Sequence, residues 1–224
     1  TLTHRLVLEG LFGTAETIVT TKELIDRKTL ADLTVKCIVL KHKNIREKMT
    51  YAEELEYLAT NEKRNDFIVN LLQHLDGNTL CFFQLVEKHG KPLYDQVQET
   101  ITDRKTFFVY GGTDTSEREN IRGVVENEKK SIILASYGTF STGINIRNIN
   151  NIVFSSPSKS RIRVLQSLGR GLRKTDTKSH VLIFDIADDI SYNSKRNFTL
   201  NHFSERISLY NEQQFDYQIS KVKL

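Results

Sequence analysis

Short apolar runs rich in β-branched and aromatic residues alternate with longer polar segments of helical periodicity along most of the chain. Strands are expected at 34–42, 79–84, 105–112, 131–136, 151–156 and 180–186. Helices are expected around 50–60 and 62–75, up to Thr100, after a cap at Asp114, around 159–174, and from Asn201 to the end. Because strands that alternate with helices form parallel sheets, we expect an α/β fold with helices on both faces of one sheet.

The carboxyl ends of parallel strands meet at one edge of a sheet, and ligands bind there. Gln84, Gly112 and Ser136 fall at the ends of three expected strands. The stretch "SYGTFSTGINI" that begins at Ser136 holds two glycines and five hydroxyl side chains. Hydroxyls and glycine-exposed amides can bind phosphate or sugar oxygens, but an ordinary turn uses the same residues. The pattern alone leaves both interpretations open.

Two further loops could bind anions. In "YGGTDTSERE" a pair of glycines precedes the expected helix, whose first unpaired amides attract negative charge. In "FFQLVEKHGKP" His89 and Lys91 lie near the next helix start. An ordinary capped loop is the more usual explanation of the first pattern, and a solvated loop explains the second equally well.

The segment "QSLGRGLRK" (166–174) predicts an amphipathic helix with a basic face. One stripe of this helix holds Arg163, Gln166, Arg170 and Arg173, and the opposite stripe holds Leu165, Leu168 and Leu172. From Lys159 to Lys174 there are six basic residues and no acidic one. Such unpaired charge suits a polyanion, because the arginine fork matches phosphate oxygens, but it also fits a solvated surface helix.

Composition limits the partners and the cellular compartment that fit this protein. The net charge of +4 and a pI near 8.9 fit nucleic-acid binding without requiring it. Cys37 and Cys81 each sit in an apolar run, which indicates buried, reduced thiols in a cytosol-like compartment. No apolar run approaches the roughly 20 residues of a membrane helix, so no membrane association is expected. The chain opens on Thr1 and its only methionine is Met49, from which we infer a piece of a longer protein.

No metal site is predicted. The histidines are scattered, and no Cys/His spacing matches a zinc site. Asp185, Asp188 and Asp189 cluster at a strand end and could hold magnesium, although loop capping or pairing with arginines is the more ordinary role. The triphosphate-binding pattern G-x-x-x-x-G-K-[ST] does not occur, so the isolated chain is not expected to hydrolyse a nucleotide.

Together these segments resemble the second motor domain of superfamily 2 helicases. Motif VI of that family, Gln-x-x-Gly-Arg-x-x-Arg, is matched by Gln166, Gly169, Arg170 and Arg173. Motif V is matched by "ASYGTFSTGIN", motif IV by "LCFFQ", and the following phosphate-contact loop by "YGGT". Within the superfamily the chain is most similar to phage recombination helicases. The resemblance implies a RecA-like, P-loop NTPase-like fold that lacks the P-loop itself.

The resemblance also implies a nucleotide site shared between two domains. ATP with Mg²⁺ would be held mainly by a preceding RecA-like domain of the same protein. Arg170 and Arg173 would reach the γ-phosphate as catalytic residues, and Gln166 and Gly169 would shape the same surface. Gly143 and Asn145 would lie beside the sugar, although many members of the family have aspartate where this chain has Asn145.

Nucleic-acid contacts follow from the same resemblance. Ser136 matches a position that touches the nucleic-acid backbone. Weaker candidates for the same track are Gly112, Thr113, Gln84 and Lys91.

The resemblance finally suggests domain limits and a cellular role. Residues 1–33 would connect to the preceding domain, 34–200 would form the RecA-like domain, and 201–224 would be a helical extension. The whole protein would act as an ATP-dependent helicase on branched or single-stranded DNA in phage recombination or repair, in the host cytoplasm. A standalone nucleic-acid-binding module and a restriction-type translocase remain the alternatives.

Overall fold

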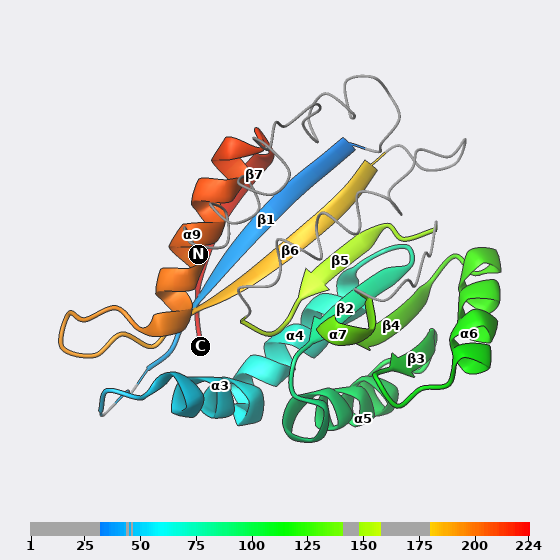
Figure 1. Cartoon of the computed structure of the whole chain (residues 1–224), viewed down its shortest axis with the longest axis horizontal. Helices are drawn as coiled ribbons and strands as arrows, with labels where there is room; N and C mark the ends of the chain where they lie inside the picture. The colour runs from blue at the N-terminus through cyan, green and yellow to red at the C-terminus, as the bar shows by residue number, and fades with distance from the viewer. Residues whose placement is uncertain (1–31, 44, 46, 141–147, 158–179) are drawn as a thin grey trace, which may run out of the picture.

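The computed structural model describes residues 32–43, 45, 47–140, 148–157 and 180–224. Seven strands form one sheet in the order β3-β4-β2-β5-β6-β1-β7. Their bounds are β1 Asp32–Lys41, β2 Thr79–Phe83, β3 Lys105–Val109, β4 Ser131–Ser136, β5 Asn151–Phe154, β6 His180–Asp189 and β7 Asp216–Lys223. Every pairing is parallel, which confirms the predicted parallel sheet (Figure 1).

The described helices lie where the sequence periodicity places them, except the short α7, which falls where a polar loop was expected. They are α3 Tyr51–Thr60, α4 Glu62–His74, α5 Lys91–Thr100, α6 Thr115–Asn127, α7 Tyr137–Phe140 and α9 Phe198–Glu212. Thr50 and Glu53 form a reciprocal capping box at the start of α3, and Asn61 caps α4. A π-helical turn, η1 Val86–Gly90, leads into α5. Gly90 is needed there, because a Cβ would lie 2.5 Å from the Phe83 ring.

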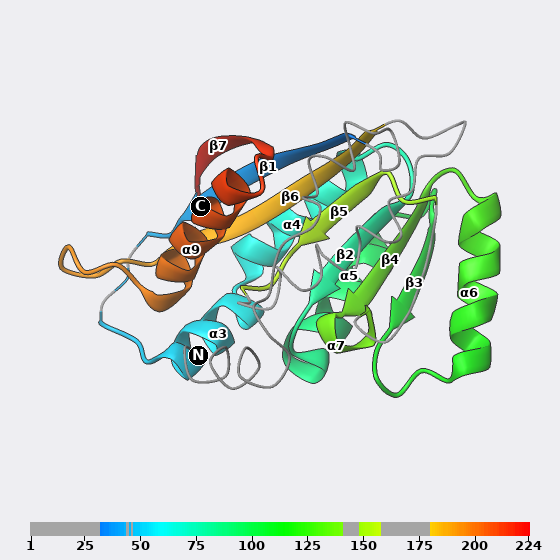
Figure 2. The ribbon, with the colours of Figure 1, turned by 45° about the horizontal axis from the view of Figure 1, so that its top comes forward.

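Helices cover both faces of the sheet, as predicted (Figure 2). One core cluster joins the inward residues of β1, β2 and β4 to Ile121 and Val125 of α6 and to Phe203 of α9. The other cluster joins the opposite side of the strands to residues of α4 and α5, such as Ile68 and Val97. Successive residues of a strand therefore pack into opposite core clusters.

The predicted helix from Asn201 to the end of the chain is wrong beyond Glu212. Helix α9 ends there, and Gln214 adopts a positive φ of 56°. The chain then turns back as β7, which pairs with β1 from Thr34 opposite Asp216 to Lys41 opposite Lys223. Residues 216–223 thus belong to the sheet and are not a helical extension.

Both cysteines are buried thiols outside any disulfide, as predicted. Cys37 belongs to one core cluster and Cys81 to the other. Burial raises the pKa of the Cys81 thiol to about 12, so it stays protonated and unreactive.

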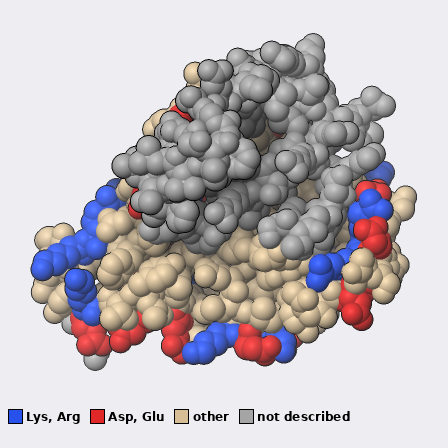
Figure 3. Space-filling view, in the orientation of Figure 1, with Lys and Arg blue, Asp and Glu red and all other residues tan. Residues whose placement is uncertain are grey.

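Charges are distributed unevenly over the surface. Acidic and basic side chains alternate along the edge formed by α3 and α5, whereas basic side chains gather at the end where the chain between β6 and α9 projects (Figure 3). Two ion pairs on the alternating edge are Lys88–Glu56 at 2.6 Å and Lys91–Glu87 at 2.8 Å. Exposed pairs of this kind contribute little to stability.

Candidate functional site

The predicted nucleotide-binding residues lie outside the described residues. Gln166, Gly169, Arg170 and Arg173 fall in 158–179, and Gly143 and Asn145 fall in 141–147. Both segments connect elements of the sheet along the chain. Residues 141–147 follow β4 and α7, and residues 158–179 join β5 to β6. The roles of these six residues therefore remain predictions.

Ser136 ends β4 with its side chain largely buried. Its Oγ lies 2.6 Å from the Oγ1 of Thr139 in α7, and the residue is 8% exposed. The hydroxyl thus contributes to the turn after the strand. A contact with a nucleic-acid backbone stays a prediction.

Gln84 lies where β2 ends, and its side chain is exposed. Its backbone N–H donates to the Oγ of Ser156, 3.2 Å away, which ties the ends of β2 and β5 together. Ser156 Oγ also lies 2.9 Å from Nδ1 of His89, in the turn before α5. The structure therefore brings three connections together at the carboxyl edge of the sheet.

Gly112 and Thr113 form the turn after β3. Tyr110 N–H donates to Oγ1 of Thr113 at 3.0 Å, and Thr113 N–H donates to the Tyr110 carbonyl at 3.0 Å. A Cβ on Gly112 would lie 2.6 Å from the Tyr110 ring, so close approach of that ring requires glycine. The geometry of this turn explains why glycine and threonine occupy these two positions. Their contact with phosphate stays a prediction.

Lys91 begins α5 with its charge already paired. The ammonium donates to Glu87 at 2.8 Å, and this hydrogen bond raises the pKa of Lys91. The pair is exposed, so a phosphate oxygen could replace the carboxylate at little cost.

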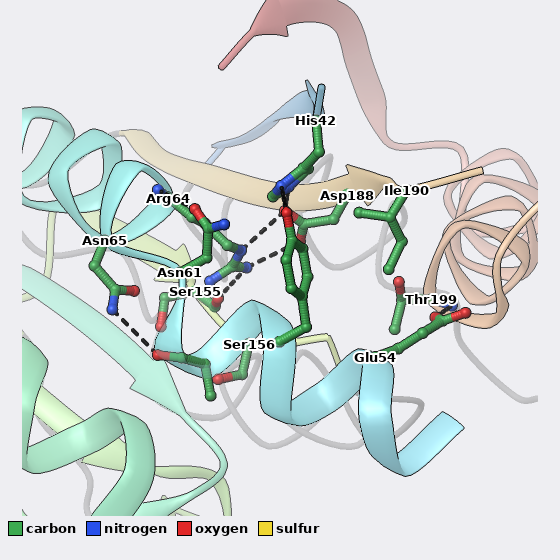
Figure 4. A network of polar contacts seen from close by, with 12 residues as sticks. His42, Glu54, Asn61, Arg64, Asn65, Ser155, Ser156, Asp188, Ile190 and Thr199 are labelled. Carbon is green, nitrogen blue, oxygen red and sulfur yellow. Dashed lines mark hydrogen bonds and ion pairs between the residues drawn. The ribbon is translucent and has the colours of Figure 1, made fainter. Parts of the chain in front are cut away.

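The sequence did not identify the partners in the buried ionic network at the ends of β1, β5 and β6 (Figure 4). Arg64 of α4 binds Asp188 of β6 with two hydrogen bonds, of 2.9 Å from Nε and 3.0 Å from Nη2. The same Nη2 donates to the Ser155 carbonyl at 2.6 Å, and His42 Nε2 lies 2.9 Å from Asp188 Oδ1. Arg64 and Asp188 are fully buried. The network fixes α4 against the carboxyl ends of three strands.

Electrostatics keep Asp188 ionised. Burial would raise the pKa of this carboxyl, but the Arg64 guanidinium and the hydrogen bonds from His42 and Arg64 outweigh that effect and lower the pKa to about 2. Arg64 shares a helical stripe with Ile68 and Leu72, both buried. An arginine on an apolar stripe needs a buried carboxylate, and this was the signal that could have revealed the pair.

The aspartates of "FDIADD" do not converge on one point. Asp185 faces α9, where it accepts from Arg206 Nε at 2.8 Å and from the Tyr210 hydroxyl at 2.8 Å. Asp188 faces α4 on the other side of the sheet. The expected pairing with arginines is confirmed for Asp185 and Asp188, whereas Asp189 accepts from the Ser191 N–H at 3.1 Å, the loop-capping alternative. Within the described ranges, no three His, Cys, Asp or Glu side chains are grouped as metal ligands would be.

His89 and Arg64 line the same small hollow, together with Gln84 and Ser156. Burial, followed by the nearby Arg64 charge, lowers the pKa of His89 from 6.5 to about 3, so the imidazole is neutral at pH 7. Nε2 of His89 and Nη1 of Arg64 are buried, and neither has a hydrogen-bond partner among the residues that the structure describes.

The stability of the domain is expected to fall as the pH drops below about 6.5. Unfolded His89 takes up a proton near that pH, whereas folded His89 resists protonation down to about pH 3. The stabilisation is complete above the unfolded pKa and is lost toward the folded pKa, with a slope of up to about 1.4 kcal/mol per pH unit. Urea unfolding at several pH values should give a flatter profile for His89→Gln. The exposed His74→Gln serves as the control, and an unchanged slope in His89→Gln would contradict the assignment.

Comparison with known proteins identifies the domain. The family model described as "Helicase conserved C-terminal domain" matches residues 62–175, which is half of the chain. The chain belongs to this helicase C-terminal domain family. The match spans α4 to the segment that carries Gln166, Gly169, Arg170 and Arg173, so the resemblance drawn from those residues is confirmed at the level of the family.

Relatives agree with this assignment. The ATP-dependent DNA helicase uvsW of Enterobacteria phage T4 is 34% identical over 233 residues, which cover 96% of this chain and 46% of that protein. The crystal structure of T4 UvsW superposes with a TM-score of 0.73 at 32% identity, covering 96% of this chain and 44% of that chain. This helicase C-terminal domain thus spans under half of the length of its phage relative.

More distant structures share the fold alone. The type ISP restriction-modification enzyme LlaBIII gives a TM-score of 0.63 at 12% identity over 96% of this chain and 17% of that enzyme. The C-terminal domain of the DEAD-box protein Dbp5 gives 0.54 at 12% identity over 88% of this chain and 92% of that domain. The fold is accordingly the RecA-like fold of helicase C-terminal domains. No helix in the described part of the chain has the length and apolar character needed to cross a membrane.

Proposed function

We propose that this chain is the second motor domain of an ATP-dependent DNA helicase that acts on branched or single-stranded DNA. The similarity to a phage DNA helicase over 96% of the chain is the observation that carries the proposal. In this role the domain completes a nucleotide site whose other wall belongs to a preceding RecA-like domain. Recombination or repair in the host cytoplasm would be the setting.

The arrangement of the sheet supports this role. The segments that hold Arg170 and Arg173 and that hold Gly143 and Asn145 connect strands of the central sheet, beside the described ends of β4 and β5. In parallel α/β sheets such strand-end connections form the ligand site. Arg170 and Arg173 supply permanent charge and a fork that fits phosphate oxygens. Closure of the two domains on ATP would bring these arginines to the γ-phosphate, and hydrolysis would release them.

The DNA contacts we propose are Ser136, Gly112, Thr113, Gln84 and Lys91. They lie at or just after the ends of β4, β3 and β2, which are neighbours in the sheet, or begin the next helix. Contacts from such loops go to the sugar–phosphate backbone and do not depend on base sequence. The buried Arg64–Asp188 pair holds the scaffold behind these loops and is not proposed to touch DNA.

The full-length protein should hydrolyse ATP in a DNA-dependent manner and displace a strand from a forked duplex. Hydrolysis without displacement would favour the restriction-type translocase. DNA binding with no DNA-stimulated hydrolysis would refute the motor role and favour a standalone binding module. The isolated chain should not hydrolyse ATP, because a triphosphate-binding loop is missing from its 224 residues.

A further inference from the structure

A second candidate contact surface lies at the carboxyl ends of β1 and β6, whereas Gln84, Gly112 and Ser136 lie at the ends of β2, β3 and β4. These neighbouring strands are followed by two connections, residues 42–50 and 190–197. Between the connections lies a hollow of about 260 Å³ that is open to solvent. Its lining includes Lys48, Glu54, Tyr192, Lys195, Arg196 and Phe198. We call this hollow the basic groove.

The connection that forms one wall of the basic groove is held in a defined shape. Tyr192 and Lys195 exchange backbone hydrogen bonds of 3.1 and 2.9 Å around Asn193 and Ser194, which have φ values of 47° and 61°. Two consecutive positive φ values are typical of a tight type I′ turn. At the base, Asn197 accepts from Ile190 N–H at 3.1 Å and donates to the Asp188 carbonyl at 3.1 Å. The turn projects from the body of the domain in both ribbon views (Figures 1 and 2).

The basic groove has an excess of positive charge. No carboxylate in the described residues lies within ion-pair distance of Lys48, Lys195 or Arg196. Glu54 is the one acidic residue among the described lining residues, and it is 2% exposed. Its two carboxylate oxygens accept from the first amides of α9, Phe198 N–H at 2.9 Å and Thr199 N–H at 3.0 Å. Glu54 therefore caps the helix and does not neutralise the cations.

Aromatic side chains lie among these cations. Phe198 is 41% exposed, which is unusual for a large apolar side chain, and Tyr192 is half-buried in the same lining. Cations that contact phosphates combined with exposed aromatic rings that stack on bases characterise single-strand binding surfaces. A duplex would present its phosphates but would keep its bases stacked inside.

We propose that the basic groove binds a single-stranded segment of nucleic acid as a contact site separate from the motif-bearing loops. The choice of nucleic acid as the ligand rests on the proposed function. The groove lies on the same edge of the sheet as the end of β4, three strands away, or about 14 Å at the usual strand spacing. One strand of DNA can therefore touch both surfaces, and the groove extends the track along the edge.

The test uses the full-length protein and a fluorescently labelled oligo-dT, with binding measured by anisotropy at several salt concentrations. Lys195→Gln combined with Arg196→Gln should weaken binding about 20-fold at 0.1 M salt and reduce the slope of log affinity against log salt by about 1.4. Lys129→Gln combined with Lys130→Gln removes the same charge from the exposed turn before β4, at the opposite edge of the sheet. This control should keep the wild-type affinity and slope.

Tyr192→Ala separates a stacked single strand from other polyanions. It should weaken oligo-dT binding about fivefold or more while the salt slope stays at the wild-type value. Loss of polyglutamate binding in the Lys195/Arg196 variant, with oligo-dT binding intact, would overturn the proposal and indicate an acidic polypeptide. Wild-type affinity and slope for oligo-dT in that variant would also overturn it and leave the proposed function standing. If the wild-type protein failed to bind oligo-dT at all, the groove proposal would be wrong, and the proposed function would stand for branched DNA only.

Discussion

Replacing Arg170 with alanine in the full-length protein is expected to lower ATP turnover by about 10³-fold or more while ATP binding stays near the wild-type level. The reason is the timing of the contact. A guanidinium that stabilises charge on the γ-phosphate acts mainly in the transition state, so its loss raises the barrier by roughly 4 kcal/mol or more without removing ground-state affinity. Single-turnover hydrolysis and equilibrium binding of a fluorescent ATP analogue measure the two effects separately.

Arg122→Ala provides the matched control for Arg170→Ala. Arg122 is a surface arginine of α6 that pairs with Glu119 at 2.7 Å, so its removal should leave turnover unchanged. Arg173→Ala should resemble Arg170→Ala. Wild-type turnover in Arg170→Ala, or a loss of ATP binding as large as the loss of turnover, would remove Arg170 from the catalytic role.

Asp188→Ala is expected to destabilise the domain by about 3–5 kcal/mol, because it leaves the buried Arg64 guanidinium without its counter-ion. Arg64 is fully buried, and its remaining acceptor is the Ser155 carbonyl. For a domain of this size such a loss corresponds to a fall in Tm of about 6 to 20 °C. Thermal unfolding followed by circular dichroism gives the value directly.

Two further variants identify the cause of that loss. Asp95→Ala removes an exposed carboxylate from α5 and should change stability by about 0.5 kcal/mol or less. Arg64→Met combined with Asp188→Leu removes both charges and should recover most of the lost stability, because no buried charge remains unpaired. If the double variant were as unstable as Asp188→Ala, packing and not the unpaired charge would be responsible.

The sheet was predictable because each central strand carries its own apolar signal. "TLCFF" and "SIILAS" are buried along their whole length, as continuous apolar runs in parallel sheets are expected to be. The edge strand β7 was missed for the opposite reason. Most of its residues are exposed, and the turn before it relies on a positive φ at Gln214, where a glycine would have marked the end of the helix.

The candidate site was predictable only for residues at strand ends, whose place in a parallel sheet follows from their place in the sequence. Gln84, Ser136 and Gly112 were placed at the strand-end edge because parallel strands bring their carboxyl ends together. The pairing of Arg64 with Asp188 joins residues 124 positions apart, and no local pattern specifies such a partner. The basic groove was missed because its cations come from two separate connections, and neither is strongly basic by itself.

The pairing of β7 with β1 also constrains how the domain is completed during synthesis. The outer edge of β1 gains its neighbour only after residues 216–223 have left the ribosome, because Thr34 lies opposite Asp216. At ordinary rates of translation, the ribosome takes about 10 to 40 s to synthesise the chain from Thr34 to Asp216. Throughout this interval the nascent chain carries an open strand edge beside Val35 and Cys37, so this is the period in which a chaperone would protect it from association with other chains.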